Sequence, residues 1–351
     1  MAQDIELGLD TFGDVTVDES GRPLPHDAVL RNVADEAVFA DSVGIDFFGV
    51  GEHHRADFAI SAPEVVLAAI AGRTERIRLG SAVTVLSSDD PVRVYERFAT
   101  LDALSNGRAE VILGRGSFTE SFPLFGYDLR DYDVLFEEKL DLFAKILEGE
   151  PVTWSGTTRP ALEAQGIYPP TASRLKTWIG VGGNPESVIR AARYGFPLVV
   201  AIIGGDPLRF VPLVGLYRRA LDELGRPSLP VAAHGPGHLA DTDEQAREEL
   251  WPHYRVMINR IGRERGWPAV TREQYEAAAG PEGALMVGSP ETVAAKIVRS
   301  VAGLGLSRFS LKYSAGTLPH EKMLRSIELY ATKVVPLVRD RLASPPLRSA
   351  S

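Results

Sequence analysis

The sequence predicts an α/β protein built as a single (β/α)8 barrel, and three observations lead to this prediction. Apolar segments of strand type alternate with amphipathic segments of helix type along nearly all of the 351 residues. Eight strands can be identified, the number that closes a barrel of parallel strands. No predicted strand leads into a G-x-G-x-x-G turn and no P-loop sequence occurs, which argues against the alternative, an open doubly wound sheet.

The predicted strands are short apolar runs bounded by turn residues. In order they are 5–10, 45–51, 76–86, 108–113, 176–181, 197–203, 229–233 and 308–312. The predicted helices place apolar residues on one face at helical spacing. They cover 28–43, a segment that begins near 63, and then 92–104, 132–147, 185–194, 208–224, 244–261, 290–304 and 320–337.

Local signals mark several helix ends. Gly44 follows the last periodic residue of the first helix and is typical of a helix C-terminus. Ser61 and Glu64 have the spacing of a capping box ahead of the second helix. Ser289 followed by Pro290 is typical of a helix start, because proline suits the first helical position.

Two segments are additional to the eight strand–helix units of a minimal barrel. The first is 114–132 with its sequel 151–171, after strand four, and the second is 262–288, before the last strand. Long loops in a compact domain are usually functional or disordered, and the first is placed to cover the barrel mouth as a lid. Because α/β barrels run as one unit, we expect one domain over 1–340 and a flexible tail over 341–351.

Composition excludes several classes of function. The net charge is −9, from 47 acidic and 38 basic residues, and no basic cluster favours nucleic acid. The absence of cysteine excludes disulfides, thiolate nucleophiles and cysteine-based metal sites. The amino end lacks a signal-peptide pattern, and no apolar run is long enough to cross a bilayer. We therefore expect a cytoplasmic protein without a membrane segment.

The strongest catalytic candidates are Glu52, His53 and His54, which directly follow a buried strand. In a parallel barrel the carboxyl ends of the strands form the active site, so a carboxylate and two imidazoles there suggest acid–base chemistry. The alternative is structural: one histidine caps a helix or binds a carbonyl and the other is solvated. Strand alternation alone does not decide which histidine points inward.

A second pattern suggests an anion site. Gly182, Gly183 and Asn184 join a predicted strand to a helix, whose first turn has free N–H groups and a positive dipole. Ser187 adds a hydroxyl, and Arg115, directly after strand four, offers a guanidinium suited to phosphate. The alternative is that the glycines only permit a tight turn.

A metal-dependent barrel hydrolase is a further alternative, because such enzymes also place histidines at strand ends. The seven histidines include no early H-x-H pair. His234 and His238 are predicted to lie in a Gly/Pro loop and not on one helical face. No metal site is predicted.

Several short motifs, in matching order and spacing, together resemble the bacterial luciferase-like flavin-dependent monooxygenases. They are GEHH at 51–54, GSAVTVL at 80–86, DPVR at 90–93, LSNGR at 104–108, GRG at 114–116, GGNPES at 182–187 and VGSPE at 287–291. Each motif is short and partly glycine, so the specificity comes from the set. The resemblance extends over nearly the whole chain.

This resemblance implies a barrel that binds reduced flavin mononucleotide (FMN) at its carboxyl-end mouth, where molecular oxygen and a small organic substrate meet it. It implies that the flavin ring packs near Ala82, Val83 and Thr84, with a non-proline cis peptide between Ala82 and Val83. The alternative there is an ordinary β-bulge. His53 matches the histidine close to the reacting flavin, with a pKa expected near working pH, and Glu52 or His54 would orient it.

The sequence also departs from luciferase. Gly114 stands where luciferase has a reactive cysteine, and Asp133 lies near the position of a second phosphate-binding arginine. Phosphate affinity would therefore be weaker, or be supplied by Ser117 or Arg130. Light emission is not implied.

The predicted function is that of an FMN-dependent monooxygenase acting on a small organic substrate. Two different functions fit the same fold, namely a deazaflavin-dependent oxidoreductase and a non-catalytic flavin-binding protein. Since no nicotinamide-binding fingerprint is visible, we expect a separate NAD(P)H-linked flavin reductase to supply reduced FMN. The resemblance implies a homodimer or higher oligomer packed through the early helices.

Overall fold

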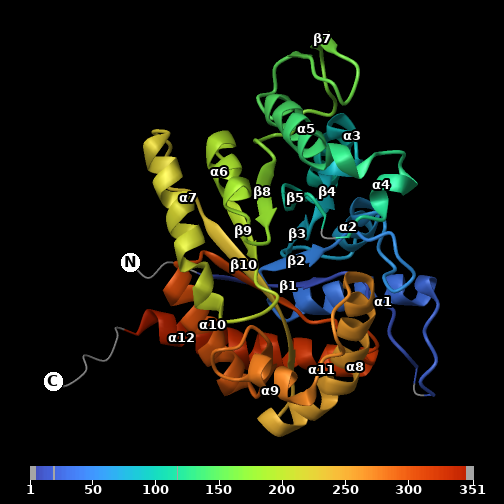
Figure 1. The fold of residues 1–351 in the computed structure, drawn as a ribbon, viewed down its shortest axis with the longest axis vertical. Coiled ribbons are helices and arrows are strands. Elements are labelled where there is room, and N and C mark those ends of the chain that lie inside the picture. Colours follow the sequence, from blue (N-terminus) through green and yellow to red (C-terminus); the bar gives the residue numbers. More distant parts are fainter. Residues whose placement is uncertain (1–4, 19, 117, 345–351) are drawn as a thin grey trace, which may run out of the picture.

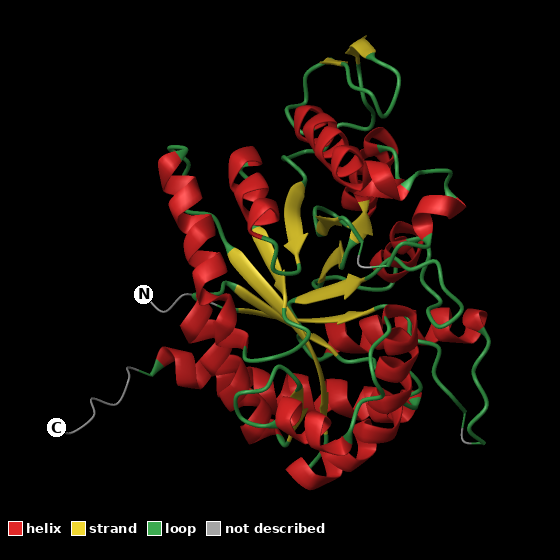
Figure 2. Cartoon of the chain, in the orientation of Figure 1, coloured by secondary structure: helices red, strands yellow, loops and turns green. Residues whose placement is uncertain are grey.

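Eight parallel strands close into a barrel in the computed structural model, which describes residues 5–18, 20–116 and 118–344 (Figures 1 and 2). Each strand pairs with the next, and the last pairs with the first, so the predicted (β/α)8 barrel is confirmed. The strands are β1 (Glu6–Thr11), β2 (Phe47–Val50), β3 (Arg78–Ser81), β5 (Ala109–Gly114), β8 (Lys176–Val181), β9 (Leu198–Ala201), β10 (Val231–Leu239) and β12 (Arg308–Lys312).

Helices surround the barrel on the outside (Figure 2). The main helices are α1 (His26–Ser42), α2 (Pro63–Ala71), α3 (Pro91–Leu104), α5 (Tyr132–Ile146), α6 (Pro185–Tyr194), α7 (Val211–Glu223), α8 (Asp243–Arg265), α10 (Pro290–Leu304), α11 (His320–Leu329) and α12 (Val335–Ala343). The last predicted helix, 320–337, is α11 and α12 joined by a π-helical turn, Tyr330–Val334. Pro336 has no N–H for the usual helical bond, which accounts for the change of pitch there.

Two local predictions at the start of the barrel are wrong. The predicted strand 76–86 ends at Ser81, and after a cis peptide it continues as β4 (Thr84–Val85) and a 3₁₀ turn. The predicted capping box is absent: Ala62 is the N-cap of α2 and no side chain caps it. Pro63 takes the first helical position, so Ser61 lies one residue too early, and the buried Glu64 pairs with Arg97 at 3.4 Å instead.

His234 and His238 lie in β10 and not in a loop, which corrects the sequence prediction. The strand continues because its second half pairs with β11 (Met286–Gly288), a strand the sequence did not reveal. A Cβ at Gly237 would come within 2.3 Å of the Met286 carbonyl oxygen, so the glycine permits this close pairing.

Both predicted insertions carry regular structure. The first contains α4 (Ser121–Leu124), a 3₁₀ turn and an antiparallel hairpin of β6 (Val152–Trp154) and β7 (Leu162–Gln165), which projects beside α5 at the top of Figure 1. The second contains α9 (Arg272–Ala279) and β11. At the carboxyl end α12 continues through Ala343, so the predicted boundary at 340 falls inside a helix, and residues 345–351 lie outside the described part.

The barrel interior is layered because alternate residues of each strand point inward. The layer at the amino ends is an ion cluster centred on the fully buried carboxylate of Glu110. Glu110 accepts hydrogen bonds from Arg308 at 2.9 Å, from Trp178 at 2.7 Å and from Arg78, and it lies 3.1 Å from the Lys176 ammonium. An apolar layer follows, formed by Phe47, Ile112, Trp178 and Ala232.

Above the apolar layer the interior becomes polar again. Asp10 and Lys312 are partners in the β1–β12 register, and His234 lies on the neighbouring β10. This third layer is at the carboxyl ends of the strands and faces the mouth of the barrel.

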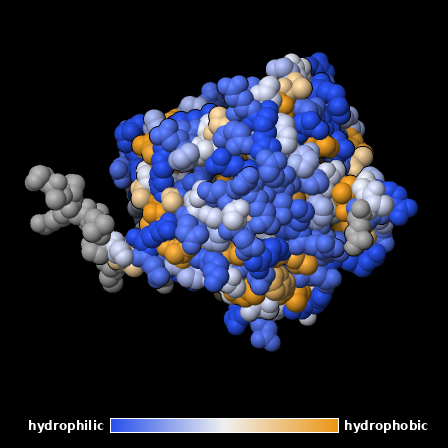
Figure 3. Space-filling model, turned by 90° about the horizontal axis from the view of Figure 1, so that it is seen from below, coloured by the Kyte–Doolittle hydropathy of each residue, from blue (hydrophilic) through white to orange (hydrophobic). Residues whose placement is uncertain are grey.

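The molecular surface in Figure 3 is mostly hydrophilic, with apolar residues in small groups. Among the helices of the described residues, none combines the length and the apolar character that crossing a bilayer requires.

Candidate active site

The predicted site residues lie on four neighbouring strand ends. In barrel order β2, β3, β5 and β8 are consecutive. Residues 52–54 follow β2, the Ala82–Val83 peptide follows β3, Arg115 follows β5 and Gly182 follows β8. The structure therefore brings these residues to one half of the barrel rim, at the end of the barrel where parallel barrels carry their chemistry.

The Ala82–Val83 peptide is cis, as the resemblance implied. The Ala82 N–H donates to the Val50 carbonyl at 2.8 Å, and the Val83 carbonyl accepts from the Glu52 N–H at 3.1 Å. Ala82 and Val83 are half-buried, whereas Thr84 is fully buried and its hydroxyl has no hydrogen-bond partner among the described residues. Of the three predicted ring-contact residues, only Ala82 and Val83 are therefore accessible from the mouth.

Val83 also explains why position 114 is glycine. A Cβ on Gly114 would come within 2.6 Å of a Val83 methyl, and one on Gly180 within 2.9 Å of the other. The side chain of Val83 thus occupies the space that a side chain at position 114 would need. The two glycines allow the cis segment to pack directly on β5 and β8.

Glu52 is a structural link at the end of β2. One carboxylate oxygen lies 2.8 Å from His54 Nε2 and the other accepts the Val85 N–H at 2.8 Å. The hydrogen bond to Glu52 raises the pKa of His54. Glu52 and His54 bind each other, and among the described residues no hydrogen bond joins either side chain to the His53 imidazole.

His53 is enclosed by aromatic rings. Its imidazole stacks on Phe58 at 4.5 Å between centroids and meets the edges of Phe12 at 4.8 Å and Phe118 at 5.2 Å. Burial lowers the pKa of His53 to about 4, with Lys312 acting in the same direction. The prediction of a pKa near working pH is therefore wrong. At neutral pH His53 is an uncharged hydrogen-bonding group in an apolar cage.

Arg115 is held by its neighbours at the rim. Its guanidinium binds Asp133 at 2.7 Å and stacks over Tyr132, 5.0 Å from the ring centroid. The side chain of Asp133 is 77% exposed, and that of Arg115 is 20% exposed. An anion at Arg115 would therefore compete with a solvated carboxylate. Arg130, a predicted substitute, binds Asp128 instead, and Ser117 lies outside the described residues.

The start of α6 is shaped to receive an anion. Asn184 is the N-cap and accepts the Glu186 N–H at 2.8 Å. Gly183 has φ +119°, and a Cβ on Gly182 would meet nothing within 4 Å, so open space lies before the helix. Ser187 is buried in the first turn. Because β5 and β8 pair, Arg115 and this loop occupy adjacent strand ends.

The sequence analysis missed the other half of the rim, on β10, β12 and β1. The Lys312 ammonium binds Asp14 at 2.9 Å and lies over the Phe12 ring, 4.6 Å from its centroid. His234 Nδ1 lies 3.0 Å from the Asp10 carboxylate. Asp10 and Lys312 each stand at or beside the end of a predicted strand, so the rule that selected His53 also applies to them.

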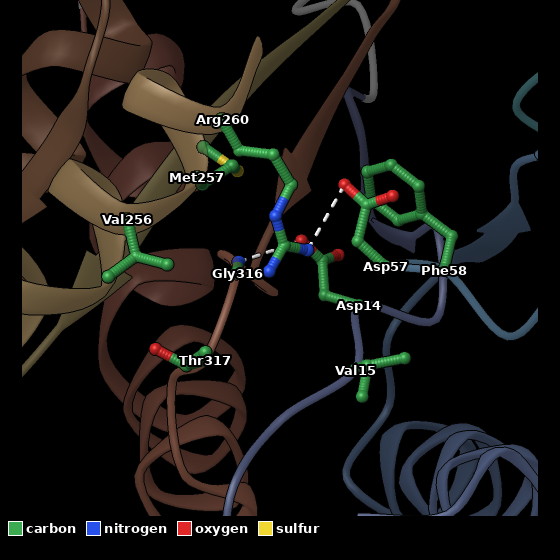
Figure 4. A pocket seen from close by; sticks show the side chains of 9 residues that line it. All are labelled: Asp14, Val15, Asp57, Phe58, Val256, Met257, Arg260, Gly316 and Thr317. Carbon is green, nitrogen blue, oxygen red and sulfur yellow. Dashed lines mark hydrogen bonds and ion pairs between the residues drawn. The ribbon is translucent and has the colours of Figure 1, made fainter. Parts of the chain in front are cut away.

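A clasp of ion pairs joins α8 to the loop after β2. Arg55 binds Glu264 at 2.5 and 2.8 Å, and Arg260 reaches Asp57 at 3.4 Å (Figure 4). Beneath Arg260 is a cavity of about 10 Å³, roughly the space of one water molecule. These contacts attach α8 to the loop that carries Phe58, one of the rings around His53.

The described residues contain no group of three or more histidine, cysteine, aspartate or glutamate side chains able to hold a metal ion.

The chain is similar to named enzymes over most of its length. It is 27% identical over 307 residues to limonene 1,2-monooxygenase of Rhodococcus erythropolis, covering 84% of this chain and 78% of that one. The FMN complex of the oxygenating constituent of 3,6-diketocamphane monooxygenase from Pseudomonas putida superposes with a TM-score of 0.74 at 20% identity, covering 95% and 98%. An F420-dependent secondary alcohol dehydrogenase superposes with a TM-score of 0.76 at 17% identity, covering 96% and 100%.

A sequence model of the family described as luciferase-like monooxygenase matches residues 11–308. The match runs from the last residue of β1 to the first residue of β12, so it includes residues 52–54, Arg115 and His234, whereas Asp10 and Lys312 lie just outside it. It confirms the predicted family and the predicted enzyme class, an oxidoreductase that incorporates molecular oxygen. The chain belongs to the luciferase-like monooxygenase family.

Proposed function

We propose that this protein is a monooxygenase that uses reduced FMN and molecular oxygen to oxygenate a small organic substrate. The observation that carries the proposal is that Arg115 and the open glycine loop before α6 lie on adjacent strand ends, and that the accessible Ala82–Val83 peptide follows the next strand of the barrel. A guanidinium and a helix N-terminus suit a phosphate, and a small residue suits a flat ring. The FMN complex of the diketocamphane enzyme, which shares the fold, supports the choice of flavin.

Each part of the rim would have a separate task. Bound reduced flavin would supply the two electrons that activate oxygen. Arg115 and the first turn of α6 would bind the phosphate, and Ala82 would let the ring approach the barrel. The rings of Phe12, Phe58 and Phe118 would exclude water around His53, which would offer a neutral hydrogen bond to the reacting atoms.

A deazaflavin-dependent oxidoreductase is the second candidate, because an F420-dependent dehydrogenase shares the fold. Titration of the protein with FMN and with a deazaflavin coenzyme distinguishes the two. We expect FMN to bind at least about tenfold more tightly, a difference of about 1.4 kcal/mol, and the reverse order would favour the second candidate. Metal-dependent hydrolysis is not proposed, since the family incorporates oxygen.

We also propose a separate NAD(P)H-linked flavin reductase as the donor of reduced FMN, and a cytoplasmic homodimer packed through the early helices. Exposed apolar side chains, Val65 on α2 and Leu104 at the end of α3, support contact through that region. Light scattering of the purified protein gives the oligomeric state.

Replacing Arg115 with alanine is expected to raise the Kd for FMN about tenfold to a hundredfold, because a charge-assisted contact with phosphate is lost. The measurement is quenching of flavin fluorescence during titration. Arg130→Ala is the matched control, since Arg130 is an exposed arginine of the same region bound to Asp128. An unchanged Kd in Arg115→Ala would contradict this placement of the phosphate.

Replacing Asp133 with asparagine is expected to have the opposite effect. The Asp133 carboxylate competes with phosphate for the Arg115 guanidinium and repels its negative charge. Because exposed ion pairs contribute up to about 1 kcal/mol, FMN affinity should rise by up to about fivefold. The same titration with Asp128→Asn, which alters a carboxylate that binds Arg130, should show no gain. Weaker binding in Asp133→Asn would contradict competition.

A further inference from the structure

A carboxylate–imidazole pair lies inside the barrel mouth, on the half of the rim that the proposed flavin contacts do not use. It consists of Asp10 on β1 and His234 on β10. We infer that His234 is an acid–base residue of the oxygenation reaction and that Asp10 is its positioning residue. This inference rests on the proposed function and assigns the proton transfer within it.

The geometry of the pair fixes which ring nitrogen is reactive. His234 Nδ1 lies 3.0 and 3.1 Å from the two carboxylate oxygens of Asp10, which is 1% exposed. An ionised carboxylate only accepts hydrogen bonds, so Nδ1 carries the proton and donates it. Nε2 then keeps its lone pair, and it has no hydrogen-bond partner among the described residues. The side chain of His234 keeps 13% exposure, so the ring is not sealed in the barrel interior.

The fold places His234 at the mouth end of the barrel interior. β12 separates β1 from β10, so Asp10 and His234 contact each other across the barrel interior and not along a shared ladder. The residue of β12 beside His234 in the register is Ser310, which is small enough to leave room for the contact. Both residues belong to the polar layer above Trp178 and Phe47, at the carboxyl ends of the strands.

His53 and His234 are both neighbours of the Phe12 ring, but their environments differ. Phe12 lies 4.8 Å from His53 and 6.2 Å from His234 between centroids. The His53 ring packs against the rings of Phe12, Phe58 and Phe118, whereas Nδ1 of His234 lies 3.0 Å from the Asp10 carboxylate. Of the two, His234 has the environment that a proton-transfer residue requires.

The proton balance of the reaction gives His234 its task. Reduced flavin supplies two electrons and two protons, one oxygen atom enters the organic substrate and the other leaves as water. His234 Nε2 accepts a proton at the reacting centre, Asp10 stabilises the resulting imidazolium, and the proton is returned to the oxygen atom that leaves as water. Without a substrate both oxygen atoms leave as hydrogen peroxide, with the same two electrons and two protons.

The first test uses the protein loaded with reduced FMN and mixed with oxygenated buffer, which requires no knowledge of the substrate. In His234→Gln we expect the Kd for FMN to stay within about threefold and the rate of flavin reoxidation to fall about 10²-fold or more. Asp10→Asn should also lower the rate, and Asp10→Glu should restore most of it. His26→Gln is the control, because His26 is exposed and binds only the Ala56 carbonyl.

The second test needs no cofactor. In nitrogen-15 NMR of the histidines of the ligand-free protein, we expect neutral His234 to carry its proton on Nδ1 and not on Nε2. The charged groups of the surrounding elements are Asp10 on β1 and the Lys312–Asp14 pair, with His53 beyond Phe12. Asp10→Asn should shift the balance of the two His234 tautomers, because an amide, unlike a carboxylate, can also donate a hydrogen bond to Nδ1.

The outcomes separate the two proposals. Failure of the wild-type protein to bind FMN would overturn the proposed function, while the NMR result would still report on His234. Tight FMN binding with full reoxidation in His234→Gln would overturn the inference alone. A His234 protonated at Nε2, or one insensitive to Asp10→Asn, would overturn it as well.

Discussion

Replacing Glu110 with glutamine is expected to lower the free energy of unfolding by about 3 to 5 kcal/mol. The substitution keeps the shape but removes the charge that Arg308, Lys176 and Arg78 surround, and Arg308 is itself almost fully buried. Uncompensated cations at the base of the barrel are costly because little water reaches them. Urea-induced unfolding followed by circular dichroism measures the loss.

Two variants show whether the charge cluster is the cause. Glu328→Gln removes one charge from an exposed pair with Arg325 and should change stability by less than about 1 kcal/mol. The double variant Glu110→Gln with Arg308→Met should be more stable than Glu110→Gln alone, because it removes one of the buried cations that outnumber the remaining carboxylate, Glu6. A double variant that is less stable than the single one would contradict this explanation.

The cluster also predicts a pH dependence. Burial raises the pKa of Glu110, but the adjacent cations outweigh it and lower the pKa to about 2. Because the pKa of Glu110 is lower in the folded than in the unfolded protein, its charge stabilises the fold fully at pH values above the unfolded pKa of about 4.3. This stabilisation is lost as the pH falls towards the folded pKa of about 2. The difference in the free energy of unfolding between wild type and Glu110→Gln should therefore become smaller as the pH falls from about 4.3 to about 2.

Replacing His53 with alanine is expected to lower the oxygenation rate by about 10² to 10³ while FMN affinity changes only a few fold. The proposed phosphate contacts follow β5 and β8, whereas His53 follows β2, so binding and chemistry should separate. Because its pKa is about 4, His53 stays neutral at physiological pH, and its contribution should not vary between about pH 6 and 8. Single-turnover oxidation of bound reduced flavin measures the rate.

His54→Ala is the comparison for that experiment. His54 binds Glu52 and packs on Phe125, so its loss should disturb the loop and cost less activity than the loss of His53. Equal losses in the two variants, or full turnover in His53→Ala, would contradict the assignment. Either result would favour a structural role for both histidines.

The fold could be predicted because the signals of a parallel barrel are local. Each strand that lines the barrel appeared as a short apolar run, and β8, α6 and β12 have the predicted bounds. β10 was cut short because Gly235, Pro236 and Gly237 are usual turn residues. Only the tertiary contact with β11 shows why glycine is needed in that strand.

The site was predicted on one half of the rim and missed on the other. Residues 52–54, Arg115 and 182–184 belong to contiguous motifs, so the sequence and its resemblance to a family revealed them. Asp10 and His234 lie 224 residues apart and each is a single polar residue within an apolar run. Only barrel closure brings them together. In the same way the pKa of His53 depends on Phe12 and Phe118, which come from other loops.

The side chains that fill the amino end of the barrel limit how molecules reach the candidate active site at the other end. Glu110 and Arg308 seal the amino end, and Phe47, Ile112 and Trp178 fill the interior above them, so no passage runs along the barrel axis. In the proposed reaction, flavin, oxygen, substrate and product would therefore share one entrance. A compound held in that entrance blocks all the others. Departure of the oxidised flavin or of the product then sets when the next catalytic cycle can begin.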